Sequence, residues 1–251
     1  MKNFWKRLKK GVKAALFPEH IKCIRCGCEL PESKRYDLCE DCFRLLPFND
    51  RKVCVKCGCH VEGKGDFCLR CMNTEYAFFK ARSALIYEAA AKDLIYEYKF
   101  NGKRYLAKPF AQMLADAYAQ TDFEFDVAVP VPMTKISLKK RGFHPSALLT
   151  KEFCAIIGKE WNETDLKKEK HTHTQVGLSG AERRDNLKGA FRVSNKQAFY
   201  GKKVLIVDDV KTTGATIHEC AKTLRKAGAN EVYALTLASV KQAISFENDK
   251  E

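Results

Sequence analysis

The chain has no apolar run approaching the roughly 20 residues that a membrane-spanning helix requires. Its basic N-terminus also lacks the unbroken apolar stretch and the small-residue cleavage site of a secretory signal. Acidic residues are scarce relative to basic ones, 31 against 45, which leaves a formal net charge of +14. We therefore expect a cytoplasmic protein without a transmembrane segment. Its positive charge favours phosphate-bearing partners such as nucleotides, nucleic acid or an anionic membrane surface, without choosing among them.

Residues 1–20 form a basic segment with an amphipathic pattern. Phe4, Trp5, Leu8 and Val12 fall on one helical face, with lysines opposite. Such a helix either packs on its own protein or lies against a membrane surface or a partner. The first is the more common use of a basic amphipathic end, and peripheral attachment to a membrane stays open as the alternative.

Ten of the twelve cysteines lie between Cys23 and Cys71 and form an internal repeat. Each copy has the pattern C-x2-C-G-C, then a polar loop, then C-x2-C. In a reducing cytosol this spacing favours metal over disulfides, because two C-x2-C pairs supply the four thiolates of a tetrahedral zinc site. Residues 21–75 are thus predicted to form a zinc-binding module with two structural zinc ions. The predicted ligands are Cys23, Cys26, Cys39 and Cys42 in the first copy and Cys54, Cys57, Cys68 and Cys71 in the second.

Two alternatives for the zinc ligands remain open. The four pairs could interleave, first with third and second with fourth, and Cys28 or Cys59 could replace a neighbouring cysteine. In either case four thiolates leave no coordination position for water or substrate, so the zinc would be structural. Cys154 and Cys220 stand alone in apolar surroundings and are predicted to be core residues.

From Tyr76 onward, strand-like and helix-like segments alternate. This predicts an α/β domain over residues 76–251, with a mostly parallel sheet and helices on both faces. The polar, glycine-containing residues 165–187 predict a long functional or disordered loop. The predicted strands are residues 81–87, 126–131, 203–207 and 231–239, and the predicted helices are residues 89–99, 105–119, 145–157 and 215–227.

The string VLIVDDVKTTGAT, residues 204–216, carries the strongest chemical signal. Its apolar half predicts a buried parallel strand that ends at Asp208 and Asp209, followed by a short loop and a helix. Ligands of open α/β sheets bind at the carboxyl ends of the strands, and a helix N-terminus favours an anion. Because carboxylates accept hydrogen bonds from ribose hydroxyls but repel phosphates, the pattern fits a ribose 5-phosphate lying across the strand end.

The segment VDDVKTTGAT resembles the phosphoribosyl pyrophosphate (PRPP) signature of type I phosphoribosyltransferases. Four further segments resemble one branch of these proteins, the ComF family: residues 98–102, 129–132, 140–143 and the spaced positions from Gln175 to Phe191. The resemblance extends from Cys23 to about Ser239. It implies a phosphoribosyltransferase-like fold, an N-terminal cysteine zinc module and a part in DNA uptake during natural competence.

The resemblance also implies roles by position. Asp208 and Asp209 are the catalytic candidates and would hold the ribose hydroxyls, with Asp209 as a candidate general base. Residues 165–187 would form a mobile lid. The predicted anion contacts are Lys211, Thr212, Thr213, Gly214 and Thr216 for the 5′-phosphate, a loop with Lys139, Lys140 and Arg141 for the Mg²⁺-bound pyrophosphate, and Arg183 and Arg184 as charge clamps in the lid.

One departure from the family pattern stands beside this site. The family usually has Asn-Gln where this chain has His144 and Pro145, so any contact that those amides make is altered here. His171 and His173, in the polar loop, are expected to be solvated rather than bound to metal.

Two functions fit these patterns. The first is a ComF-like competence factor that binds PRPP and single-stranded DNA, with a DNA-uptake helicase or other competence proteins as partners. Phe143 and Phe191, beside basic residues, are candidate DNA contacts or core residues. The second is an active phosphoribosyltransferase that transfers ribose 5-phosphate to an unidentified base or amine, although no acceptor-base motif is recognisable.

Overall fold

The computed structural model describes residues 22–32, 34–62, 65–169 and 187–241. The chain divides into two compact units, Met1–Leu46 and Pro47–Glu251. Predictions for the basic segment 1–20 and for the lid residues Arg183 and Arg184 therefore lie outside the described residues, as do those for His171 and His173. Within the described ranges, no helix is long and apolar enough to cross a membrane.

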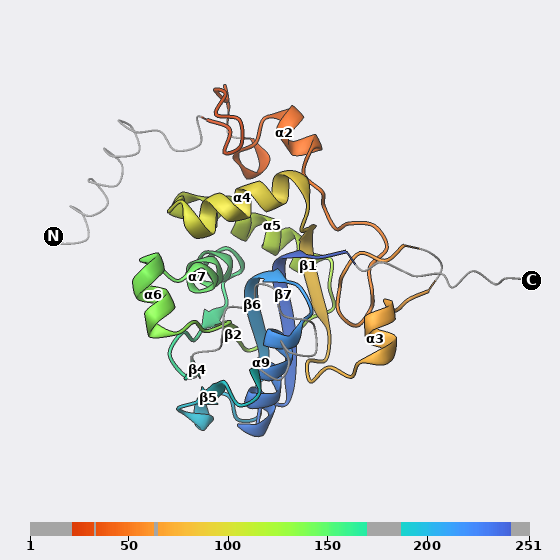
Figure 1. The fold of residues 1–251 in the computed structure, drawn as a ribbon, viewed down its shortest axis with the longest axis vertical. Helices are drawn as coiled ribbons and strands as arrows, with labels where there is room; N and C mark the ends of the chain where they lie inside the picture. The colour runs from red at the N-terminus through yellow and green to blue at the C-terminus, as the bar shows by residue number, and fades with distance from the viewer. Residues whose placement is uncertain (1–21, 33, 63–64, 170–186, 242–251) are drawn as a thin grey trace, which may run out of the picture. The chain divides into compact units, whose positions relative to one another are not determined.

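The larger unit is built around a parallel five-stranded sheet (Figure 1). Neighbouring strands pair in parallel throughout this sheet, which confirms the predicted α/β class. β6 lies at its centre and is buried from Val204 to Val207. The strand order is β1 (Ala81–Ile86), β7 (Glu231–Ser239), β6 (Lys203–Lys211), β2 (Val127–Pro130) and β3 (Glu160–Trp161).

Helices pack on both faces of this sheet (Figure 1). Along β6, Val204 and Ile206 join a core cluster with Ile217 and Leu224 of α9 (Ala215–Lys226). Leu205 and Val207 of β6 point to the opposite face of the sheet, because side chains alternate along a strand. That face is covered by α5 (Ala107–Ala119) and α7 (Pro145–Ile157), and α4 (Ala89–Phe100) precedes α5 through the short helix η2 (Arg104–Leu106).

Smaller elements complete the larger unit. α3 (Leu69–Asn73) follows the second cysteine repeat, and α6 (Lys135–Arg141) lies between β2 and α7. β4 (Leu166–Lys168) and β5 (Phe191–Val193) form a separate antiparallel pair, followed by the short helix η3 (Lys196–Ala198).

Two local predictions near the expected site were wrong. β6 continues to Lys211 instead of ending at Val207, because β7 pairs with it as far as Ser239. The connection to α9 is therefore only residues 212–214. The residues expected in the pyrophosphate loop, Lys139 to Arg141, lie instead in the helix α6. Its N-terminus is capped by Thr134, which accepts a hydrogen bond from the Ser137 N–H at 3.2 Å.

The second cysteine repeat packs on the sheet and belongs to the larger unit. Cys54, Cys59 and Cys68 are 0–1% exposed and share a core cluster with Val204 and Leu224. The repeat is also hydrogen-bonded to β1, since the Ala81 N–H donates to the Lys56 carbonyl at 2.9 Å. This repeat is therefore part of the hydrophobic core beneath α9.

The smaller unit holds the first cysteine repeat. Its first two cysteines lie on a turn in which the Gly27 N–H donates to the Cys23 carbonyl, as the Gly58 N–H does to the Cys54 carbonyl in the second repeat. Cys39 lies at the start of α2 (Glu40–Arg44) and Cys42 lies within its first turn. α2 follows the short helix η1 (Arg35–Asp37). The two repeats thus fold alike locally.

Candidate functional site

Two carboxylates lie near the carboxyl end of β6 and have different partners. Asp209 is 6% exposed and forms an ion pair with Lys99 of α4, with 2.8 Å between the amine and the carboxylate oxygen. Burial is the largest single effect and opposes the charged amine of Lys99. The charge and the hydrogen bond of Asp209, with the charge of Asp208, together outweigh it and raise the pKa of Lys99. The pair therefore holds α4 against the end of the central strand.

Asp208 is held by neutral donors instead. Its Oδ1 accepts hydrogen bonds at 2.9 Å from the Ser146 hydroxyl, in the first turn of α7, and from the Asp209 N–H. Burial, and then the negative charge of Asp209, raise the pKa of Asp208 to about 7. One of the two adjacent carboxyls thus holds its proton up to near-neutral pH, which is typical of functional sites.

Residues 212–214 connect β6 to α9, and we call them the phosphate loop because the sequence predicts 5′-phosphate contacts there. Gly214 has a φ of 79°, in the left-handed region, and a Cβ there would lie 3.2 Å from Cε1 of Tyr76. Glycine is therefore favoured by the left-handed backbone conformation, and the close approach of the Tyr76 ring leaves little room for a Cβ. Thr213 Oγ1 accepts from the Ala215 N–H, the first N–H of α9, at 3.3 Å.

The predicted 5′-phosphate contacts lie at this junction, but not all in the loop. Thr212, Thr213 and Thr216 are half-buried at the end of β6 and the start of α9. Lys211 is the last residue of β6 and is only 4% exposed, so it belongs to the strand. Its contact with a phosphate stays a prediction.

The predicted pyrophosphate contacts lie in the last turn of α6. Lys139 and Lys140 are exposed, and the guanidinium of Arg141 lies over the ring of Phe100, 4.9 Å from its centroid. Arg141 also lies close enough to oppose the positive charge of Lys99, the partner of Asp209. α6 therefore brings a cation toward the carboxylates at the end of β6.

His144 and Pro145, the positions that depart from the family pattern, organise the start of α7. His144 Nδ1 accepts from the Ala147 N–H at 3.2 Å, which caps the helix, and burial lowers the pKa of His144 to about 4. The Pro145 carbonyl accepts from the Tyr98 hydroxyl at 2.8 Å. Both positions therefore have structural roles beside the site.

The two aromatic residues considered as DNA contacts are buried. Phe143 is 8% exposed and Phe191 is 7% exposed. Phe143 packs edge-on against Tyr98, and Phe191 belongs to the core cluster beneath α9. Their role is packing, which was the alternative interpretation of the sequence.

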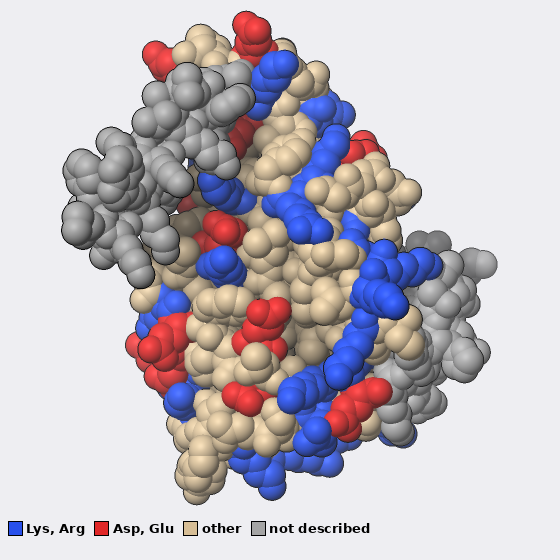
Figure 2. Space-filling model, turned by 90° about the vertical axis from the view of Figure 1, so that its left-hand side faces the viewer, with Lys and Arg blue, Asp and Glu red and all other residues tan. Residues whose placement is uncertain are grey.

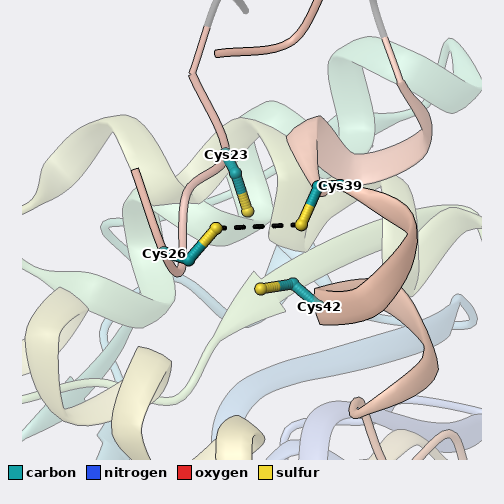
Figure 3. Close-up of side chains that lie close together, drawn as sticks. All are labelled: Cys23, Cys26, Cys39 and Cys42. Carbon is teal, nitrogen blue, oxygen red and sulfur yellow. Dashed lines mark hydrogen bonds between the residues drawn. The ribbon is translucent and has the colours of Figure 1, made fainter. Parts of the chain in front are cut away.

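The cysteines gather into two tetrads, each within one repeat. In each tetrad the sulfur atoms all lie within 4.8 Å of one another, and Figure 3 shows the four side chains of the first tetrad pointing toward a common centre. A zinc ion with Zn–S bonds of about 2.3 Å would place its four sulfur atoms roughly 3.8 Å apart, so both tetrads could hold zinc. We call them the first cysteine cluster (Cys23, Cys26, Cys39, Cys42) and the second cysteine cluster (Cys54, Cys57, Cys68, Cys71).

This grouping follows the order of the pairs in the sequence and not the interleaved alternative. Cys28 is exposed and is not one of the four residues of the first cluster, but its thiol interacts with those of Cys26 and Cys39 beside it. Cys59 is fully buried, with its sulfur 3.4 Å from that of Cys57, so it stands beside the second cluster. Cys154 and Cys220 are 2% and 0% exposed, which confirms them as core residues.

The sequence did not indicate four side chains at this site. Lys99 lies in a segment that resembles the ComF family, but nothing in that segment pointed to Asp209. Ser146 has no local signal. Arg70 and Tyr76 contact the phosphate loop, and the only trace of this in the sequence is that Arg70 replaces the Asp41 of the first repeat.

Comparison with known proteins agrees with this geometry. Residues 111–250 match the family described as "Phosphoribosyl transferase domain", so the chain contains a domain of this class. It is 30% identical over 225 residues to "Competence protein F" of Haemophilus influenzae, covering 87% of this chain and 97% of that protein. It is 28% identical to "DNA utilization protein YhgH" of Escherichia coli K12 (82% and 92%) and 27% identical to "Competence protein ComFC" of Streptococcus pneumoniae (86% and 99%). The chain belongs to the ComF family.

Proposed function

We propose that this protein binds PRPP with Mg²⁺ at the carboxyl end of β6 and acts in DNA uptake or DNA utilization. The observation that carries the proposal is the pair Asp208–Asp209 near the end of the central strand, which is joined by a three-residue loop ending in Gly214 to the N-terminus of α9. The names of the relatives refer to competence and DNA utilization, and they support the proposed part in DNA uptake or utilization.

In this proposal each part of the site binds one part of the ligand. The carboxylates of Asp208 and Asp209 accept hydrogen bonds from the ribose hydroxyls, and residues 212–216 hold the 5′-phosphate at the positive end of α9. Lys140 and Arg141 of α6 face the pyrophosphate. Mg²⁺ would supply charge neutralisation on the pyrophosphate when PRPP is bound.

Calorimetric titration of PRPP into the zinc-loaded protein with Mg²⁺ tests this site. The double variant Asp208→Asn, Asp209→Asn should lose binding at least about tenfold, because each amide keeps the shape of the side chain but loses the charge-assisted acceptor. The matched control is Asp122→Asn, an exposed carboxylate paired with Lys80. Full PRPP affinity in the double variant would show that the ligand does not bind at the end of β6.

Active transfer of ribose 5-phosphate to a base or amine is the alternative use of the same site. Mg²⁺-dependent release of pyrophosphate from PRPP, measured against a panel of bases and amines, separates the two. Release with one acceptor establishes a transferase, and binding without release establishes PRPP as a regulatory ligand.

A surface on α4 and α6 supports single-stranded DNA as a second ligand. Tyr96 and Phe100 of α4 are 55% and 57% exposed, their ring centroids are 5.0 Å apart, and Arg141 covers one side of Phe100. Exposed aromatic rings stack on bases, and neighbouring cations hold the phosphates. Figure 2 shows Lys and Arg side chains gathered in a band on one face of the molecule.

Fluorescence anisotropy with a labelled oligothymidylate tests this surface. We expect binding that weakens steeply with salt, and a loss of about tenfold or more in the variant Tyr96→Ala, Phe100→Ala, since stacking contributes about 1–3 kcal/mol per base. Tyr200→Ala, which removes a ring that is 70% exposed on the turn after η3, is the control. Equal binding by both variants would place DNA elsewhere.

A further inference from the structure

The second cysteine repeat is bonded directly to the phosphate loop. Arg70, which lies between Cys68 and Cys71, donates from Nη1 to the Thr212 carbonyl at 3.0 Å. The Tyr76 hydroxyl donates to the Thr213 carbonyl at 2.7 Å. A third bond, from the Ala77 N–H to Nδ1 of His218 at 3.0 Å, joins the same segment to the first turn of α9.

These bonds fix the orientation of two consecutive peptide groups. In a trans peptide the carbonyl and the following N–H point in opposite directions, and the described chain contains no cis peptide bond. Because the carbonyls of Thr212 and Thr213 are turned toward Arg70 and Tyr76, the N–H groups of Thr213 and Gly214 point to the other side of the loop. An anion at a helix N-terminus is bound by such N–H groups.

The contact between the repeat and the loop is closely packed. The Tyr76 ring lies against Gly214 and stacks on Phe78, with 4.8 Å between ring centroids. The cavity left between the repeat and the loop is about 10 Å³, room for at most one water molecule. The loop therefore has little freedom to turn its carbonyls away while the repeat keeps its shape.

The residue directly before the last cysteine differs in charge between the two repeats. The second repeat has Cys68-Leu69-Arg70-Cys71, whereas the first has Cys39-Glu40-Asp41-Cys42. Arg70 can donate to a carbonyl, and a carboxylate at that position cannot. Zinc binding requires neither residue, so the difference points to a second task of the second repeat.

We propose that Arg70 and Tyr76 are positioning residues for the 5′-phosphate, and that the second cysteine cluster, when loaded with zinc, holds them in place. Metal content at this cluster then sets the affinity for the phosphoribosyl ligand. The inference rests on the proposed PRPP binding, and the first cysteine cluster provides its internal control.

Two conservative variants test the positioning role without touching a cysteine. Arg70→Met keeps the aliphatic stem and loses the donors, and Tyr76→Phe keeps the ring against Gly214 and loses the hydroxyl. In each, the amides of residues 212–216 should exchange hydrogen faster in the ligand-free protein, while those of β6 and β7 should not. PRPP affinity, measured by calorimetry with Mg²⁺, should fall about tenfold for each, the effect of losing one hydrogen bond of about 1.4 kcal/mol. Asp41→Met, the equivalent change in the first repeat, should alter neither.

The metal dependence is tested with equivalent cysteines. Cys42→Ser and Cys71→Ser should each lower the zinc content by one ion, but only Cys71→Ser should speed exchange in the loop and weaken PRPP binding. Equal effects of the two variants would overturn the metal dependence. If Cys71→Ser unfolds the larger unit, Arg70→Met and Tyr76→Phe still decide the positioning role.

The outcomes also separate this inference from the proposed function. Wild-type exchange rates and PRPP affinity in Arg70→Met and Tyr76→Phe would overturn the positioning role and leave PRPP binding standing. A wild-type protein that binds no PRPP would overturn the proposed function. The exchange rates of residues 212–216 would then decide alone whether the second repeat positions the loop.

Discussion

Asp208 and Asp209 are neighbours in the sequence, yet the structure gives them opposite electrostatic surroundings. Asp209 has the Lys99 amine as its partner, whereas Asp208 has a hydroxyl, an N–H group and the repulsion of Asp209. Two adjacent carboxylates that each had a cation would both stay ionised. This pair instead has one carboxyl whose pKa is raised to about 7, at the site that we propose for the ribose hydroxyls.

This asymmetry predicts a pH-dependent stability that is specific to Asp208. Because its folded-state pKa of about 7 exceeds the ordinary value of 3.8, folding takes up a proton, and stability falls as the pH rises from about 4 to about 7. One such group changes the free energy of unfolding by at most about 1.4 kcal/mol per pH unit. Asp208→Asn keeps an oxygen that accepts both hydrogen bonds, and it removes the decrease in stability with rising pH.

Chemical denaturation at a series of pH values between 5 and 8 checks this expectation. The variant should become more stable relative to the wild type as the pH rises. A difference between the two proteins that is constant with pH would mean that Asp208 titrates at its ordinary value in the folded protein.

At the scale of elements, the sequence predicted most helices and strands of the larger unit. The helix α7 and the strand β7 have the predicted bounds, because their apolar patterns are strong and their ends are marked by proline, glycine or polar residues. β6 was predicted four residues too short, since three of the residues from Asp208 to Lys211 are charged and this part of the strand is ordered by pairing with β7. α6 was missed because its seven residues give too short a pattern.

The two cysteine repeats contain the same glycine turn, but its surroundings differ between them. In both copies the turn that carries the first two cysteines ends at a left-handed glycine directly after the second one, Gly27 with a φ of 77° and Gly58 with a φ of 62°. A Cβ at Gly58 would lie 2.3 Å from the Ala81 carbonyl oxygen of β1, whereas a Cβ at Gly27 would have no described atom within 4 Å. The second turn is therefore pressed against the sheet.

This contrast predicts different costs for the same substitution. Gly27→Ala should destabilise the protein by roughly 1–2 kcal/mol, the cost of left-handed backbone at a residue with a Cβ. Gly58→Ala should cost about 1–3 kcal/mol more, because the turn must move away from β1. Urea denaturation of both variants measures the difference, and equal losses would show that the second turn is not tightly docked.

At the scale of the whole molecule, the two cysteine clusters belong to different compact units. The second cluster is built into the core that also contains β6 and α9, whereas the first lies in the smaller unit. Zinc at the second cluster should therefore be coupled to the folding of the sheet, because metal binding to a site absent from the unfolded chain contributes directly to folding free energy.

Stepwise removal of metal checks this arrangement. We expect two zinc ions per chain, released by a chelator in two phases. The first phase should leave the circular dichroism of the sheet unchanged, and the second should be accompanied by its loss. A single phase in which both ions leave together with the fold would contradict independent clusters.

The sequence by itself determined the parts whose chemistry is local: the paired C-x2-C motifs, the alternation of strands and helices, and the strand, loop and helix around Asp208 and Asp209. Each depends on residues within a few positions of one another. Tertiary structure alone decided their partners. Lys99 is 110 positions from Asp209, and Arg70 and Tyr76 are 142 and 137 positions from the loop carbonyls they bind. Contacts at such separations depend on how the helices and the second cysteine repeat pack on the sheet. The sequence pattern of a single segment does not indicate this packing.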